Sequence, residues 1–419
     1  MNQPSDKLKI VSFLGFNKYQ EVTYLHPNYQ ENQIKVTTPF YQEALVEFYR
    51  PKTLYVLLTA TAEARNWQEL AERLDGKVEL QPIKNIPENN TPEDIWSIFD
   101  RVTDCLYSED EVIFDITHSF RSIPIVALLA ASYLRVVRQV NIRGLLYGAF
   151  EARNKETNET PSFDLFPIVS LLDWTTATDQ FVKTGNGRAL ANLIQNSNNA
   201  NDRAIELANN INNIALNLQT LRPRDLMDAA AQLPDYIRQT EPTISKDIPP
   251  FATLLKRVES DYGRFGLDLS LNEKERAREA LIKQCHLVEW YIDKQQIVQA
   301  LSIAREWLPS LLCYHFDLDP MNGEHRSEME LLLRGGKVKD KEGNTIKESK
   351  YLEQWRNIPK KNRKTLNRLW SGEFNLANLR NDVLHAGYRK KPRSAEYILE
   401  QSQKIVALLK EIISEWNIS

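Results

Sequence analysis

A run of polar side chains near the C-terminus has the composition of a phosphate-handling site. It reads Asn378-Leu379-Arg380-Asn381-Asp382-Val383-Leu384-His385-Ala386-Gly387. We predict a helix from about Phe374 to His385, closed by Gly387, because glycine readily takes the left-handed conformation at a helix C-terminus. On this helix Asn381 and His385 are four residues apart and share a face, whereas Arg380 must reach round with its long side chain. A cation, an amide and an imidazole can therefore converge on a phosphate.

These residue types are suited to acid–base chemistry at that phosphate. His385 is a candidate proton donor or acceptor near neutral pH, and Arg380 is a candidate for stabilising negative charge. An Arg and a His five residues apart are a weak motif by themselves, and a His near a glycine at a helix end is also a common structural cap. On these residues alone, both interpretations stay open.

A second set of polar side chains follows two predicted buried strands. The strand Leu8 to Leu14 runs into the loop Gly15-Phe16-Asn17-Lys18-Tyr19, and the strand Glu111 to Asp115 runs into Ile116-Thr117-His118-Ser119-Phe120-Arg121-Ser122. Ligands of parallel α/β sheets bind beyond the carboxyl ends of the strands, where loops and helix N-termini offer donors to anions. The two loops therefore predict a phosphate or nucleotide site. The alternative is that 115–122 only caps the next helix and pairs at the surface.

The elements that must position these loops alternate between strands and helices. Apolar runs predict strands at 8–14, 53–58, 78–82, 111–115 and 142–147, and a hairpin from 19–26 and 33–37. Helical spacing predicts helices at 40–49, 61–74, 91–106 and 123–137, the third capped by Thr91 with Pro92 at its first position. This alternation is typical of an α/β, Rossmann-like domain with a mostly parallel sheet covered by helices on both faces.

After Trp174 the sequence predicts helices almost exclusively. Residues 174–271 have helical spacing broken by Pro223, Pro234 and Pro249-Pro250, and we interpret them as a helical connector. From Asn272 the chain is typical of an all-α bundle, with a core helix from Gln299 to Leu312 and a closing helix from Ser394 to Trp416. The predicted domains are therefore 1–173, 174–271 and 272–419.

The overall charge does not identify a partner. The 419 residues are 42% hydrophobic and 26% charged, with a net charge of −3, so nucleic acid would have to contact a local patch. The clearest candidate is 334–368, near Trp355 and Trp370, which is either a solvated loop or an RNA-guiding patch. Its cations are Arg334, Lys337, Lys339, Lys341, Lys347, Lys350, Arg356, Lys360, Lys361, Arg363, Lys364 and Arg368.

Several other classes of site find no support in the sequence. Cys105, Cys285 and Cys313 match neither a disulfide framework nor a Cys-x-x-Cys metal site. The segment 314–319 with His325 has no standard metal-ligand spacing, so we expect no metal. The loop 184–188 lacks the Gly-Lys-Ser/Thr ending of a P-loop. With neither a signal peptide nor a membrane-length apolar run, we expect a cytoplasmic protein without membrane contacts.

Taken together, these features resemble the CRISPR-associated effector ribonucleases that join an N-terminal CARF domain to a C-terminal HEPN domain. In the N-terminal part, two segments are similar to this family. The first is Ser12-Phe13-Leu14-Gly15 with the loop to Tyr19, and the second is 115–122, which is similar to the family signature Asp-Ile-Thr-His-Gly-Phe-Arg-Ser. Ser119 replaces the glycine and adds a side chain beside the ligand. At the back, Arg380-Asn381 followed by His385 matches the Arg-x-x-x-x-His motif of HEPN ribonucleases.

The resemblance implies a two-part mechanism. A homodimer, or a higher homo-oligomer, would bind a cyclic oligoadenylate as allosteric activator, most commonly cyclic tetra-adenylate, and would then cut single-stranded RNA in type III CRISPR antiviral defence. Attack of the RNA's own 2′-hydroxyl on the adjacent phosphate would need no metal and would leave 2′,3′-cyclic phosphate ends. The implied ligand-binding residues are Gly15, Phe16, Asn17, Lys18, Tyr19, Thr117, His118, Ser119, Phe120 and Arg121.

The implied catalytic roles agree with the chemistry of the C-terminal run. His385 would act as general acid or base, Arg380 would stabilise charge on the phosphate, and Asn381 would orient the phosphate or His385. Three alternatives stay open. The protein is a ring-sensing regulator with a catalytically silent, nucleic-acid-binding bundle, or its CARF domain degrades the ring through His118 or Lys18, or it is a structural interaction protein.

Overall fold

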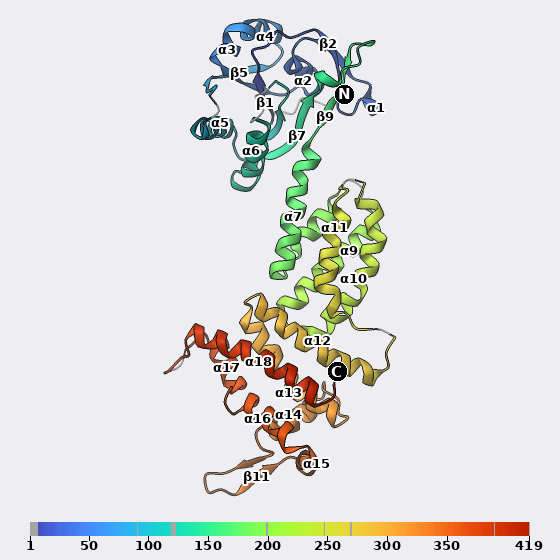
Figure 1. The fold of residues 1–419 in the computed structure, drawn as a ribbon, viewed down its shortest axis with the longest axis vertical. Helices are drawn as coiled ribbons and strands as arrows, with labels where there is room; N and C mark the ends of the chain where they lie inside the picture. Colours follow the sequence, from blue (N-terminus) through green and yellow to red (C-terminus); the bar gives the residue numbers. More distant parts are fainter. Residues whose placement is uncertain are drawn as a thin grey trace. The chain divides into compact units, whose positions relative to one another are not determined.

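A computed structural model of the chain describes residues 7–89, 91–118, 123–197, 200–246, 248–268, 270–388 and 390–418, the side chain of Ile123 excepted. The chain divides into two compact units, Met1–Asp173 and Trp174–Ser419. In Figure 1 the first unit, coloured blue to green, contains the large sheet, and the second, coloured green to red, consists mainly of helices. The predicted order of an α/β part and a helical part is thus confirmed, while a further boundary at residue 272 stays a prediction.

The first unit is built on a six-stranded sheet in the order β5-β4-β1-β6-β7-β9. All neighbouring pairs are parallel except β7 and β9. In the centre, Lys9 of β1 lies opposite Thr53 of β4, and Leu8 lies opposite Glu111 of β6. The strands are β1 (Leu8–Leu14), β4 (Thr53–Thr59), β5 (Glu79–Ile86), β6 (Glu111–Asp115), β7 (Asn141–Gly148) and β9 (Ser162–Asp164). Because β1, β4, β6 and β7 are parallel, their carboxyl ends meet at one edge.

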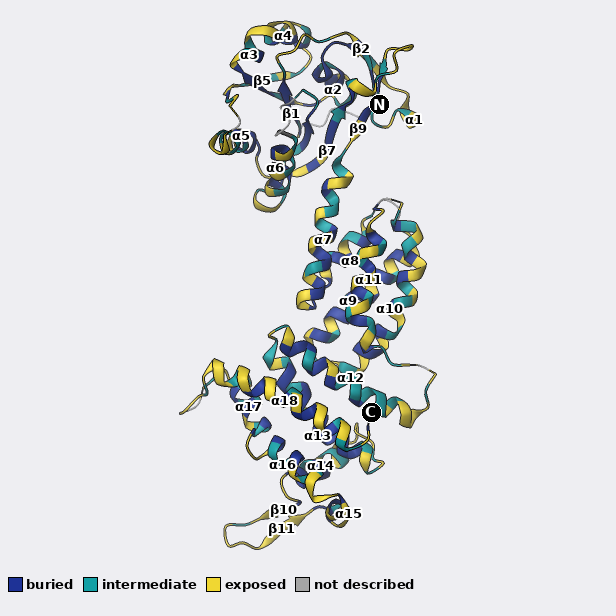
Figure 2. Cartoon of the chain, in the orientation of Figure 1, coloured by how far each residue is buried: buried dark blue, intermediate teal, exposed yellow. Residues whose placement is uncertain are grey.

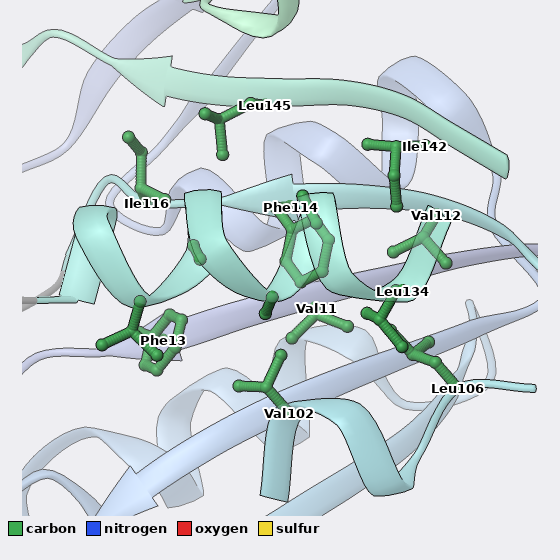
Figure 3. Packing of buried hydrophobic residues seen from close by; sticks show 14 of the residues in the cluster. Val11, Phe13, Val102, Leu106, Val112, Phe114, Ile116, Leu134, Ile142 and Leu145 are labelled. Atoms are coloured by element: carbon green, nitrogen blue, oxygen red, sulfur yellow. The ribbon is translucent and has the colours of Figure 1, made fainter. Parts of the chain in front are cut away.

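Helices cover both faces of this sheet because the strand side chains alternate between two cores. Ile10 and Leu14 of β1 belong to one apolar cluster, and Val11 and Phe13 belong to the other, which Figure 3 shows between the strands and helices α5 and α6. The helical segments are α2 (Tyr41–Tyr49), α3 (Ala60–Ala62), the π-helical η1 (Glu63–Trp67), α4 (Gln68–Leu74), α5 (Pro92–Asp104), α6 (Ile123–Val137), the 3-10 turn η2 (Phe150–Ala152) and α7 (Phe166–Thr184).

Two local predictions in this unit are confirmed. Thr91 caps α5 in a reciprocal capping box with Asp94, and Pro92 occupies the first turn. The predicted hairpin is formed by β2 (Val22–Leu25) and β3 (Lys35–Thr38), which flank the short α1 (Tyr29–Asn32). A small sheet results because β8 (Glu159–Thr160) pairs in parallel with β2.

The second unit is a helical bundle with one hairpin. Its elements after α7 are α8 (Arg188–Gln195), α9 (Asp202–Gln219), α10 (Pro223–Ile244), α11 (Phe251–Tyr262), η3 (Gly263–Phe265), α12 (Glu273–Asp293), α13 (Ile297–His315), α14 (Gly323–Leu333), β10 (Lys337–Lys339), β11 (Thr345–Glu348), α15 (Leu352–Asn357), α16 (Lys360–Trp370), α17 (Leu376–Leu384) and α18 (Ala395–Glu415). Helix α13 contacts α12, α14, α16, α17 and α18, and thus forms the centre of the C-terminal half.

The prediction that Pro234 interrupts a helix is wrong. Both Pro234 and Pro242 lie inside α10, where packing of apolar side chains such as Leu233 and Ile237 outweighs the lost backbone hydrogen bonds. Pro223 instead starts that helix, where its missing N–H has no helical partner anyway. Among the described residues, no helix is long and apolar enough to cross a membrane.

Candidate functional site

The two predicted loops meet at the carboxyl edge of the sheet. They line a cavity of about 370 Å³, which we call the strand-end cavity. The loop after β1 contributes residues 15–20, and the loop after β6 contributes Thr117 and His118. Gly148 at the end of β7 and Phe150 and Glu151 of the following turn η2 complete this part of the lining. The topology explains this meeting, because β6 lies between β1 and β7 in the sheet.

Tyr19 folds the first loop back on itself. Its hydroxyl accepts a hydrogen bond from the Gly15 N–H at 2.7 Å, and its ring packs 4.2 Å from the His118 ring, measured between centroids. Burial raises the pKa of Tyr19 well above its usual value, so the hydroxyl keeps its proton at neutral pH. A Cβ at position 15 would lie only 2.8 Å from that hydroxyl oxygen, which explains why glycine is required there.

Asn66 is a site residue that the sequence analysis missed. It lies in the π-helical segment η1 and its side-chain amide donates to the carbonyls of Gly15 and Asn17 at 2.8 and 2.9 Å. Neighbouring Arg65 donates to the Phe16 carbonyl at 3.2 Å and lies over the Phe16 ring. Single π-turns within helices are frequent at functional sites, but no residue type predicts them from a sequence.

A buried polar network lies beneath the cavity. The Ser12 hydroxyl donates to Asp115 Oδ2 at 2.6 Å, and the Thr117 N–H donates to Asp115 Oδ1 at 2.9 Å. Gln42 donates to Ser12 Oγ at 2.9 Å, and the Gly148 N–H donates to Thr117 Oγ1 at 2.8 Å. Complete burial raises the pKa of Asp115 to about 6 despite these donors. The network ties β1, β6 and β7 together at the point where their loops begin.

His118 is the most unusual side chain of the cavity. Its Nε2 atom is buried and makes no hydrogen bond with any described residue. Burial lowers the pKa of His118 to about 4, so the ring is neutral at physiological pH, although the charge of Glu151 opposes this effect. A buried polar atom without a partner is uncommon and calls for an explanation, such as an ordered water or a functional role.

The remaining predicted ligand residues differ in exposure. Phe16, Asn17 and Lys18 are exposed around the cavity, and the part of the chain that the structure describes offers no ion-pair partner to Lys18. Ser119, Phe120 and Arg121 lie outside the described residues. Glu151, which the sequence analysis missed, accepts a hydrogen bond from the Tyr147 hydroxyl at 2.8 Å.

The second predicted site lies at the C-terminal end of α17. Arg380 and Asn381 are half-buried on the helix, and His385 is exposed directly after it. The His385 N–H donates to the Asn381 carbonyl at 3.0 Å, so the two residues are on successive turns. Within the described ranges, no hydrogen bond or ion pair joins the side chains of Arg380, Asn381 and His385 to one another. One copy of the chain therefore presents these groups without fixing them together.

Our expectation that Gly387 closes this helix needs a correction. The first left-handed residue is Ala386, with φ of 52°, and Gly387 follows with φ of 70°. The Ala386 N–H donates to the Val383 carbonyl and the Gly387 N–H to the Asp382 carbonyl, both at 3.0 Å, which is a Schellman arrangement one residue earlier than predicted. The buried Asp382 carboxylate also accepts from the Arg393 N–H at 3.0 Å and so fixes the segment before α18.

The basic region 334–368 is partly structured, which the sequence did not reveal. Its first part is the β10–β11 hairpin, which is almost entirely exposed (Figure 2). Trp355 and Trp370 are 3% and 1% exposed, so neither ring is available to a ligand at the surface of this region. Both rings fill the core of the bundle because one face of α15 and one face of α16 pack inward.

The fold and the cavity place the chain among proteins with two parts: an N-terminal α/β domain with a polar cavity at its strand ends, and a C-terminal helical unit. Residues 9–151 match the family model of the CARF domain of the CRISPR system endoribonuclease Csx1. Residues 170–272 match the model of the second domain of the CRISPR-associated protein MJ1674. The N-terminal unit thus contains the predicted CARF domain, whereas the HEPN assignment of the C-terminal part stays a prediction.

Two individual proteins are also similar to the chain. MJ1674 of Methanocaldococcus jannaschii, a CRISPR-associated protein, is 26% identical over 179 residues, which are 41% of this chain and 27% of that protein. The match therefore spans little more than a quarter of the relative's length. A solved structure of Csm6 from Enterococcus italicus, bound to cyclic hexa-2'-fluoro-hexa-dAMP, gives a TM-score of 0.47 at 11% identity over 99% of this chain and 95% of that one.

Proposed function

We propose that the protein is an endoribonuclease that a cyclic oligoadenylate activates in CRISPR antiviral defence. The observation that most supports this proposal is a combination. A CARF domain similar to that of an endoribonuclease precedes a helical unit that presents Arg380, Asn381 and His385 at the end of one helix. Cyclic tetra-adenylate is the first candidate for the activator.

The strand-end cavity is the proposed sensor. Its volume of about 370 Å³ is at the lower end of small-molecule sites, which span about 300–1,000 Å³. One cavity would therefore hold part of a ring, and two copies related by a two-fold axis would hold one ring. Lys18 would pair with a phosphate, His118 Nε2 would form a hydrogen bond with the ring, and Glu151 would accept one from an adenine amino group.

The proposed chemistry at α17 is an internal transesterification. The 2′-oxygen of the RNA attacks the adjacent phosphorus, the bond from phosphorus to the 5′-oxygen breaks, and a 2′,3′-cyclic phosphate and a 5′-hydroxyl result. His385 takes the proton of the 2′-hydroxyl or supplies one to the leaving 5′-oxygen. Arg380 stabilises the negative charge on the phosphorane, and Asn381 orients the phosphate. Two copies of α17 would supply the complete set of groups.

The outer face of α6 supports a homodimer. Ile125, Leu129 and Val136 are 62%, 57% and 82% exposed, and Tyr133 and Val137 extend the same apolar row. Their spacing of four and seven residues places them along one side of the helix. This row contains no charged side chain, so two copies can pair across a two-fold axis without like-charge repulsion.

The test is cleavage of a fluorescent single-stranded RNA in EDTA, with and without cyclic tetra- or hexa-adenylate. We expect one ring to provoke cleavage in the wild type and not in His385→Ala, with 2′,3′-cyclic phosphate ends. If a ring binds tightly and no RNA is cut, the proposal fails and a ring-sensing regulator with a silent bundle takes its place. If the ring itself is shortened during the assay, the CARF domain is also a ring-degrading enzyme.

A further inference from the structure

A second cavity lies in the helical unit, between the C-terminal end of α14 and one side of α16. It is open, has a volume of about 540 Å³, and its charged lining side chains are all cationic, namely Arg334, Lys360, Arg363, Lys364 and Arg368. We call it the basic groove. Within the predicted basic region 334–368, the cations that line the groove come from one side of α16 and from Arg334, which directly follows α14.

The two lysines of α16 that line the groove do not serve the stability of that helix. Lys360, Lys364 and Arg368 follow one another at intervals of four residues, and like charges at this spacing repel each other and destabilise a helix. Among the residues that the structure describes, neither Lys360 nor Lys364 has an ion-pair partner. By contrast, Lys361 points elsewhere and pairs with Glu415 at 2.7 Å. Arg368 pairs with Glu373 at 2.8 Å and Arg334 with Glu330 at 3.7 Å, so the unneutralised cations that an anionic ligand would stabilise are the two lysines.

The arrangement fits a linear polyanion. The rise from Lys360 to Arg368 is about 12 Å, so the row is long enough to contact more than one phosphate of the same strand. Arg363 is held by a hydrogen bond from its Nε to the Ile358 carbonyl at 3.0 Å, and Asn367 adds an amide to the lining. The side-chain oxygen of Asn367 is buried and forms no hydrogen bond within the described parts of the chain, so a ribose hydroxyl is a suitable donor once the amide turns outward.

The groove includes the start of the segment that connects α16 to α17, the helix that contains Arg380. Its lining ends with Ser371 and Gly372, which directly follow α16, and only residues 371–375 separate α16 from α17. The two helices are also in contact with each other. A strand whose phosphates occupy the groove can thus continue onto α17, where Arg380 is located.

We propose that the basic groove binds the phosphates of the single-stranded RNA substrate and guides the strand to Arg380 and His385. This inference rests on the proposed function for the identity of the ligand. Because Trp355 and Trp370 are buried and no aromatic side chain lines the groove, the bases have no stacking platform there. Binding is therefore independent of sequence and strongly dependent on salt.

The experiment uses the full chain with His385→Ala, so that RNA stays intact, and measures the fluorescence anisotropy of a labelled single-stranded RNA of mixed sequence over a range of salt concentrations. The test variant is Lys360→Gln with Lys364→Gln. The matched control is Lys361→Gln with Lys404→Gln, which removes the same charge from lysines that pair with Glu415 and Glu400 outside the groove. Both pairs of substitutions leave the buried faces of their helices intact, and thermal melting checks folding.

Each lost phosphate contact reduces the salt slope of log K by about 0.7 for a single strand, so we expect the test variant to lose about 1.4 from the slope. Its affinity at about 0.1 M salt then falls about 25-fold, whereas the control stays within about twofold. Equal losses in both variants, or no loss in either, would overturn the proposal. So would poly-glutamate that competes as well as RNA of equal charge, which would assign the groove to an acidic protein.

Cleavage separates this inference from the proposed function. If a ring triggers cleavage and the test variant cuts with an unchanged KM, the groove proposal is wrong and the ribonuclease proposal stands. If no ring triggers cleavage but RNA binding still depends on Lys360 and Lys364, the groove is a nucleic-acid site and the ribonuclease proposal is wrong. If both proposals are correct, the test variant has a KM for RNA about 25-fold higher and an unchanged kcat, which matches its loss of RNA affinity.

Discussion

The strand-end cavity and the end of α17 differ in how complete they are in a single copy of the chain. In the cavity, Tyr19, Asn66 and Thr117 are fixed by hydrogen bonds that join three strands and a helix. At α17, the His385 side chain is exposed, and among the described residues it is held in place by backbone hydrogen bonds alone. One site is assembled before any ligand arrives, and the other presents its groups separately.

This difference indicates where regulation is possible. A site with fixed donors binds its ligand without a large ordering cost, which suits a sensor that must respond to little activator. A catalytic site needs its groups held within a fraction of an ångström, and loosely placed groups catalyse poorly. An enzyme whose catalytic groups converge only between two copies can therefore be kept inactive until the ligand shifts the dimer toward the productive arrangement.

The largest effect is expected from removing the imidazole. His385→Ala should lower ring-activated RNA cleavage by about 10²- to 10⁴-fold, because general acid–base catalysis contributes about that much. Ring affinity, measured by calorimetry, should not change, since the two candidate sites lie in different compact units. A matched control is His325→Ala, which removes a half-buried imidazole elsewhere in the helical unit. Cleavage that survives in His385→Ala would remove α17 from the catalytic site.

The next largest effect is expected at the outer face of α6. Val136→Asp should weaken dimerisation by about 100-fold or more, because a carboxylate would be buried without a partner at the interface. Light scattering over a concentration series measures this change. The fold of one copy should stay stable, since Val136 is 82% exposed. Glu151→Gln, in the same unit but at the cavity, is the control for altered charge. An unchanged dimer would place the interface elsewhere.

A smaller effect tests the fixed geometry of the cavity. Gly15→Ala should weaken ring binding by about tenfold, because the new Cβ meets the Tyr19 hydroxyl at 2.8 Å, and overpacking of this kind costs about 1–3 kcal/mol. Adding Tyr19→Phe removes that oxygen and should recover part of the affinity. Gly323→Ala meets no atom within 4 Å and should change nothing. Full ring affinity in Gly15→Ala would show that the loop moves freely.

Local sequence patterns predicted the bounds of an element correctly where most of its side chains are apolar. The strands Leu8–Leu14 and Glu111–Asp115 and the helix Ile123–Val137 have the predicted bounds, because most residues of each are apolar. Strand β5 extends four residues beyond the predicted Pro82, since an edge strand with mostly exposed side chains has no burial pattern. The three residues of β9 are too few to produce an alternation.

Contacts between distant parts of the chain could not be predicted. Asn66 supports the Gly15 loop from a π-turn, and Glu151 enters the cavity from the end of β7, although neither belongs to a motif. Trp355 and Trp370 lie beside many cations in sequence but point into the bundle core. In each case the packing of one element against another decides the role of the side chain, and hydrophobic periodicity contains little information about that packing.

The smallest net effect concerns the pH dependence of stability. The pKa of His118 falls from 6.5 to about 4 on folding, so stability is lost as the pH falls from 6.5 toward 4, because only the unfolded chain then gains the proton. The pKa of Asp115 rises from 3.8 to about 6, so stability is lost as the pH rises from 3.8 toward 6. Each contribution is about 3 kcal/mol, with opposite sign in overlapping windows, and together they nearly cancel.

Single variants should reveal the two hidden contributions. In Asp115→Asn only His118 titrates, so the free energy of unfolding should decrease by about 3 kcal/mol between pH 6.5 and pH 4, relative to the double variant Asp115→Asn/His118→Gln. In His118→Gln only Asp115 titrates, so stability should increase by a similar amount over the same fall in pH. Urea unfolding at several pH values measures both slopes. If the free energy of unfolding had the same slope against pH in all the variants, water would reach the buried network. The cavity would then be no better assembled before ligand binding than the site at α17.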